Sequence, residues 1–174
     1  MWSLGYSKHN MKLLKIFSQK KYKSNSEEIA HALLNNFIHC EELYKYSDFN
    51  ISETQSVEFK NRINIYLKAL TLMGVVIKEG YEQKFKKVRE YMETFIFHGT
   101  KDEYPKKNRK IKKAILKLEE LLSNQEQQRY SWPSVWLKTI GIEENNPEKL
   151  EQFSLFWIYN FKAVMEILNK FDPR

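Results

Sequence analysis

The sequence has few of the residues that form cross-links, tight loops and membrane spans. Its 174 residues include one cysteine, five glycines and four prolines. A single cysteine, Cys40, cannot form an intrachain disulfide, which excludes the small secreted folds that depend on one. The scarcity of glycine leaves little material for loops that cradle phosphate groups, and the sequence has neither a P-loop nor a dinucleotide-binding glycine motif.

Long uncharged runs are missing as well. The best two apolar runs, Ala69–Ile77 and Phe153–Phe161, have nine residues each, whereas a spanning helix needs about 20. Residues 1–10 are mixed in character and do not resemble a signal peptide. We therefore expect a cytoplasmic protein without a transmembrane segment.

The composition is that of a globular protein with a basic bias. Hydrophobic residues make up 42% of the chain and aromatic residues 14%, which is enough to bury a core. The formal net charge is +7, and 24 of the 29 basic residues are lysine. This usage is expected of an AT-rich bacterial or viral genome, so part of the lysine excess reflects codon bias. Lysine is also a poor reader of individual bases compared with arginine.

Apolar residues recur at helical spacing almost throughout, which predicts an all-α fold, a single compact bundle of five or six helices. Capping boxes at Ser24-x-x-Glu27 and Ser52-x-x-Gln55 predict two helix starts. Three glycines follow periodic runs and predict helix ends, at Gly80, Gly99 and Gly141. The remaining predicted helices begin near Phe85, at Pro105, at Ser131 and after Asn146.

Two central segments are apolar on all sides. Residues 70–77 contain Gly74 and end in Val-Val-Ile, so they are either the buried centre of a helix or a short strand. We favour the helix, with Gly74 allowing a neighbouring helix to approach closely. Residues 153–161 predict a last helix that is central or lies at a dimer contact. The inward residues expected in the last two long helices are Ile111, Ile115, Leu118, Leu122, Leu150, Phe153, Trp157, Phe161, Val164 and Leu168.

The domain organisation follows from the charge distribution. Residues 1–25 contain six lysines and no acidic residue, which predicts a basic N-terminal segment made of a short helix and a linker. Residues 26–174 form the predicted helical bundle domain. The alternative interpretation of the basic segment is an anchor to a membrane surface or an acidic partner, although one short helix holds a membrane only weakly.

Catalytic and metal-binding patterns are incomplete. Glu28 and His31 have the Glu-x-x-His spacing of di-iron bundles, but no second copy is present and their helix stripe faces away from the apolar one. Cys40 lies on the apolar stripe, where a small core residue is expected. Arg89 and His98 are too far apart in sequence for the Arg-x4-6-His pattern of helical ribonucleases. We therefore expect no metal and no cofactor.

The strongest surface signal is a basic helix face. Five positions fall on one side of the helix that begins at Pro105: Lys106, Arg109, Lys110, Lys113 and Lys117. The segment 99–118 has a net charge of +6, whereas residues 26–60 have −5. Nearby Trp132 and Trp136 could stack on bases if they were exposed, and otherwise they pack in the core.

These features favour a small non-enzymatic interaction or regulatory protein that acts through its surface, with a protein partner or a second copy of itself. The alternative is an accessory protein that binds the nucleic-acid backbone through the basic face without reading sequence. A metal-dependent or hydrolytic enzyme ranks third.

Overall fold

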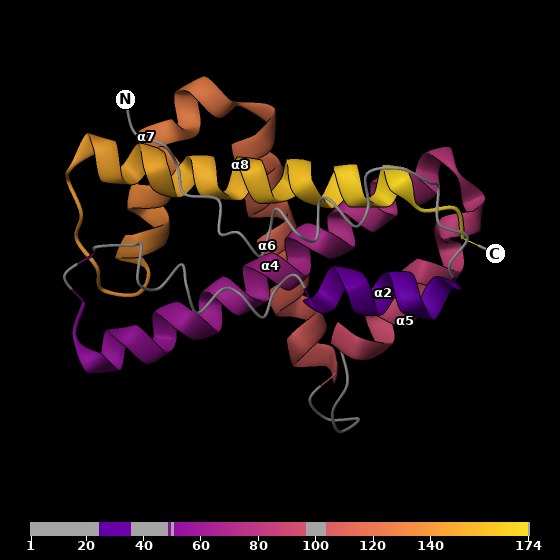
Figure 1. Cartoon of the computed structure of the whole chain (residues 1–174). Coiled ribbons are helices and arrows are strands. Elements are labelled where there is room, and N and C mark those ends of the chain that lie inside the picture. The colour runs from indigo at the N-terminus through magenta and orange to yellow at the C-terminus, as the bar shows by residue number, and fades with distance from the viewer. Residues whose placement is uncertain (1–24, 36–48, 50, 97–103, 174) are drawn as a thin grey trace.

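The computed structural model describes residues 25–35, 49, 51–96 and 104–173, and places them in an all-α bundle (Figure 1). This confirms the predicted fold class. The described elements are α2 (Ser26–Asn35), α4 (Glu53–Tyr81), the 3-10 helix η1 (Gln83–Phe85), α5 (Lys86–Ile96), α6 (Tyr104–Ser123), α7 (Gln125–Lys138) and α8 (Pro147–Lys170). The predictions for residues 1–24, Cys40, His98 and Gly99 fall outside the described residues.

The long helices α4 and α8 form the centre of the bundle (Figure 1). Helix α7 packs on α8, α2 packs on α5, and α5 and α6 both contact α4. A Cβ atom at Gly74 would lie 2.7 Å from Cγ1 of Val164, so a larger residue there would hold α4 and α8 apart. Gly74 therefore has the predicted role, and the strand alternative for residues 70–77 is wrong because they continue α4.

An aromatic cluster fills the space where α4, α7 and α8 meet. Trp136 contacts Phe59 edge-on at 5.6 Å between ring centroids, and Phe153 contacts Trp157 edge-on at 5.8 Å. Tyr66 of α4 lies against Trp132, Trp136 and Trp157. Such edge-to-face contacts add about 0.5–1.5 kcal/mol per pair beyond the burial of apolar area. The cluster therefore joins α4, α7 and α8 through their aromatic side chains.

Side-chain caps begin α2, α4 and α8. Ser52 Oγ accepts from the backbone N–H of Gln55 at 3.3 Å, and Gln55 Oε1 accepts from that of Ser52 at 2.9 Å, as predicted. Asn146 Oδ1 accepts from the N–H of Glu148 at 3.0 Å, also as predicted. The first capping box lies one residue later than predicted, because Asn25 Oδ1 accepts from Glu28 N–H at 2.8 Å. Asparagine caps a helix as well as serine does.

Helix ends follow the glycine pattern less faithfully. Gly141 has a φ of +73°, and the N–H of Ile142 donates to the carbonyl of Leu137 at 3.1 Å, which closes α7 as predicted. The prediction for Gly80 is wrong, since α4 continues through it to Tyr81. The N–H of Glu82 still donates to the carbonyl of Lys78, and the extended conformation of Glu82 ends the helix. No left-handed residue is needed there.

The predicted start of α7 at Ser131 is wrong, because Pro133 was taken as a residue of the first helical turn. The helix begins at Gln125 rather than Ser131, and Pro133 lies inside it. Proline cannot donate to the carbonyl of Arg129 four residues earlier, a loss that normally breaks a helix. Here the hydroxyl of Ser154, a fully buried residue of α8, donates to that carbonyl at 2.8 Å. A neighbouring helix thus supplies the missing hydrogen bond.

The buried side of α6 is rotated slightly from the predicted one. Ile111 and Leu118 are buried as predicted, but Ala114 and Leu121 complete the stripe. Ile115 and Leu122 are half-buried and pack against the core, as does the half-buried Phe161 of α8, so all three face the core as predicted but are only partly covered. The prediction overlooked Ala114 because alanine adds little to an apolar periodicity.

Candidate binding surface on helix α6

The basic face forms on the side of α6 that points away from the core. Arg109, Lys110, Lys113 and Lys117 are all exposed, and so is Lys112. Lys106 lies in the first turn of the same helix. Burial of Ile111, Ala114, Leu118 and Leu121 on the opposite side fixes this orientation. The indole Nε1 of Trp132 also donates to the carbonyl of Lys117 at 2.7 Å, which ties α6 to α7.

Most cations of this face make no ion pair with any described residue. Lys117 Nζ lies 2.8 Å from Glu120 Oε2, but Arg109, Lys110, Lys112 and Lys113 have no such partner within the described part of the chain. The other described arginines differ, since Arg62, Arg89 and Arg129 pair with Glu58, with Glu79 and Glu93, and with Glu151 respectively. Four cations within positions 109–113 therefore have no ion pair among the described residues, and Arg109 differs in this from the other described arginines.

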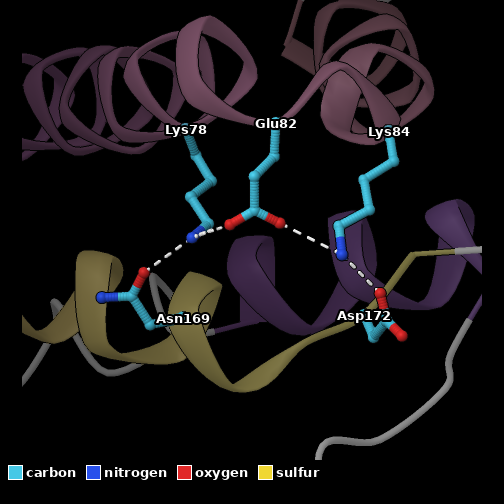
Figure 2. Close-up of polar contacts among 5 residues, drawn as sticks. All are labelled: Lys78, Glu82, Lys84, Asn169 and Asp172. Atoms are coloured by element: carbon cyan, nitrogen blue, oxygen red, sulfur yellow. Dashed lines mark hydrogen bonds and ion pairs between the residues drawn. The ribbon is translucent and has the colours of Figure 1, made fainter.

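A charge network at the far end of α4 shows the opposite arrangement (Figure 2). Glu82 lies 2.5 Å from Lys78 and 3.1 Å from Lys84, and Lys84 lies 2.5 Å from Asp172. Lys78 also donates to Asn169 of α8 at 2.9 Å. Hydrogen bonds from Lys78 and Lys84 lower the pKa of Glu82, and those to Asp172 and Glu82 raise the pKa of Lys84. These cations hold the chain end against α4.

Arg89 is committed to the fold in the same way. Its Nε donates to Glu79 of α4 at 2.6 Å and its NH1 donates to Glu93 at 3.0 Å. The hydrogen bond to Glu79 is the main cause that raises the pKa of Arg89. Arg89, the arginine that was compared with the ribonuclease pattern, therefore joins α4 to α5.

The charge order along α6 opposes the helix macrodipole. Its first turn contains no acidic residue and its last turn contains no basic residue. The N-terminal end of a helix carries a partial positive charge, so cations there destabilise it by about 0.3–1 kcal/mol each in exposed positions. The acidic residues Glu119 and Glu120 instead follow the cations, towards the C-terminal end. Nothing in the packing of α6 requires this order.

An exposed leucine lies between the cations and the acids. Leu116 is 65% exposed, the most exposed of the large aliphatic side chains that the structure describes. It lies one helical turn after Lys112 and Lys113 and one turn before Glu119 and Glu120. The predicted basic face thus has an apolar centre and an acidic continuation that the charge count alone did not reveal.

The structure excludes the tryptophans from this surface. Trp132 and Trp136 are each 4% exposed and belong to the aromatic cluster of the core. The proposed stacking of bases on these rings required their exposure and is therefore wrong. Their spacing of four residues placed both on one side of α7, and that side faces α4 and α8.

The Glu-x-x-His pattern lies on the surface. Glu28 and His31 are both exposed on α2, and His31 Nε2 lies 3.9 Å from Glu27 Oε1. The prediction that this stripe faces outward is confirmed for these two residues. Within the described ranges, no three potential ligands among histidine, cysteine, aspartate and glutamate gather closely enough to hold a metal ion.

Comparison with known proteins adds no constraint on this surface. No family model, curated protein or solved structure matches the chain. None of the described helices has both the length and the apolar character needed to cross a bilayer. The role of this surface is therefore inferred from the chemistry of α6 itself.

Proposed function

We propose that this chain is a small, non-enzymatic interaction protein whose binding surface is the exposed side of α6. The observation that supports the proposal is the run Arg109, Lys110, Lys112 and Lys113, which is exposed and has no ion pair with a described residue. Such a run repels itself until an acidic partner neutralises it. The partner class is therefore an acidic surface.

A probe of defined chemistry tests this proposal. Fluorescently labelled poly-L-glutamate is titrated with the protein, and binding is followed by anisotropy at low and at moderate salt. We expect binding that weakens with salt and is lost in the Lys110→Glu/Lys113→Glu variant. The matched control is Lys86→Glu/Lys87→Glu, which makes the same change in net charge at two exposed lysines of α5 and keeps the binding. Absence of binding at low salt contradicts the proposal.

Nucleic acid is the second candidate partner, since a dense run of lysines also neutralises backbone phosphates. The specific observation in its favour is that the cations lie within about two turns of one helix, a spacing that can follow a phosphate backbone. Labelled single-stranded and duplex DNA and RNA are the probes. A log–log salt slope that implies about four or more released counterions, with loss in the Lys110→Glu/Lys113→Glu variant, supports this alternative.

A further inference from the structure

The charged residues on the exposed side of α6 are spaced evenly about Leu116, with positive charges before it and negative charges after it. Lys112 and Lys113 precede Leu116 by four and three residues, and Glu119 and Glu120 follow it by three and four. Residues three and four apart share one side of a helix, so all five lie on the same exposed strip. Along the helix axis this strip is therefore positive, then apolar, then negative.

Such a strip is complementary to itself. If a second copy is rotated by 180° about an axis through Leu116 and perpendicular to α6, the two helices run antiparallel. Lys112 then faces Glu119 of the second copy, Lys113 faces its Glu120, and both pairs occur twice by symmetry. A two-fold interface in which one patch binds the same patch is the most common arrangement in homo-oligomers.

We infer that the partner of this face is a second copy of the chain, bound through an antiparallel α6–α6 contact centred on Leu116. The inference rests on the proposed function, because it names the acidic partner of the same surface. The parallel arrangement is excluded, since it would place lysine against lysine and glutamate against glutamate.

The acidic half of the strip distinguishes a second copy from nucleic acid. Glu119 and Glu120 are exposed beside the cations and would repel phosphate groups that followed the helix beyond Leu116. An exposed leucine also gains nothing from a phosphate backbone, whereas protein interfaces have an apolar centre with a polar rim. In an antiparallel α6–α6 contact, Glu119 and Glu120 pair with lysines and Leu116 is buried against Leu116 of the second copy.

The contact can form without disturbing the bundle. The buried stripe of α6 is on the opposite side, and the hydrogen bond from Trp132 to the carbonyl of Lys117 leaves the exposed strip open. Glu120 already accepts from Lys117 at 2.8 Å and would accept from Lys113 of the second copy in addition. A carboxylate has two oxygens and can serve both lysines.

The expected dimer is weak and salt-sensitive. One helix pair buries less area than the roughly 1,200–2,000 Å² of a standard stable interface, so the contact belongs with transient complexes. Ion pairs at its rim favour fast association and are screened by salt. Dimerisation should therefore occur at micromolar or higher concentration and decrease as the ionic strength rises.

Sedimentation velocity of the full chain tests the inference, at about 5 μM to about 500 μM, a range that covers weak dimers. The first variant is Lys112→Glu/Lys113→Glu and the second is Glu119→Lys/Glu120→Lys. We expect the wild type to dimerise at low salt, and each variant alone to weaken dimerisation at least about tenfold because like charges then face each other. The decisive sample is a 1:1 mixture of the variants, in which an all-acidic strip meets an all-basic one and heterodimers should form more tightly than the wild-type dimer.

The outcomes separate this inference from the proposed function. A wild type that stays monomeric at every concentration at low salt overturns the inference, and so does a mixture that forms no heterodimer. Dimerisation that both variants retain shows that α6 is not the interface and overturns it as well. If poly-L-glutamate still binds in those cases, the proposed function stands with another acidic partner. If poly-L-glutamate fails to bind as well, both proposals fall.

Discussion

Two groups of charges in this molecule have opposite relations to the fold. At the end of α4, Lys78, Glu82, Lys84 and Asp172 satisfy one another and join the last residues of the chain to the bundle (Figure 2). On α6, cations at positions 109–113 have no ion pair among the described residues. The first group contributes to folding. The second adds no ion pair to the fold among the described residues, and we therefore propose that it serves binding.

The largest effect expected in the first region comes from the contact that brings α8 to α4. Gly74→Val should destabilise the protein by about 3 kcal/mol, because its side chain would overlap Val164 and separate the helices near the Lys78–Asn169 contact. Urea unfolding followed by circular dichroism measures this loss.

The matched control is Gly80→Ala, another glycine of α4, with no atom within 4 Å of its added Cβ. Alanine there should stabilise the helix by about 0.5–1 kcal/mol. Equal effects of the two substitutions would contradict the close approach at Gly74.

Two arginines give the most direct test of the comparison. Arg89→Ala removes ion pairs to Glu79 and Glu93 from a largely covered site and should lower the free energy of unfolding by about 1 kcal/mol. Arg109→Ala, on the exposed side of α6, should change it by less than about 0.5 kcal/mol. Urea unfolding of the two variants measures both changes in the free energy of unfolding. A loss for Arg109→Ala equal to that for Arg89→Ala would mean that the α6 cations also stabilise the fold.

The pH dependence of the first region follows from its pKa shifts. The pKa of Glu82 is lowered in the folded protein, mainly by the hydrogen bond from Lys78, so its contribution is present above about pH 4.3 and is lost as the pH falls through the lowered value. The pKa of Lys84 is raised, mainly by the hydrogen bond to Asp172, so its contribution is present below about pH 10.4 and is lost as the pH rises through the raised value.

The variant Lys84→Met removes the central lysine of this network. Its difference in stability from the wild type should therefore be largest between these limits and shrink at both extremes of pH. Thermal unfolding of both proteins across the pH range measures the difference. A constant difference would show that methionine acts through packing and not through the lost charge.

Sequence patterns predicted the fold better than the surface. Helical spacing and the caps at Ser52 and Asn146 depend on neighbouring residues, and the structure confirms them. The prediction failed at Pro133, because the hydrogen bond that replaces the missing one comes from Ser154. This residue lies 21 positions further along the chain, on another helix. The burial of Trp132 likewise depends on α4 and α8, which no local pattern can bring together.

The candidate surface could be found from sequence only in part. The positions of Arg109, Lys110 and Lys113 on one face follow from helical spacing, and the structure places all three in solvent. Their lack of ion pairs does not follow, because partners can also come from distant parts of the chain, as Asn169 does for Lys78 and Asp172 for Lys84. Leu116 was missed although helical spacing places it on the same side as Lys112 and Lys113, because only its charged neighbours were counted.

The smallest expected change in the free energy of unfolding is that of Lys106→Glu on α6. Its sign distinguishes the α6 cations from the charge network at the end of α4. Lys106→Glu places a negative charge in the first turn of α6, where the helix dipole favours it, and should stabilise the protein by about 0.3–1 kcal/mol. The same substitution should weaken the binding of poly-L-glutamate, because it removes a cation from the proposed surface. Urea unfolding and anisotropy on the same preparation measure both quantities. If the surface serves interaction, the variant gains stability and loses binding. If Lys106 instead served the fold, the variant would lose stability and binding together.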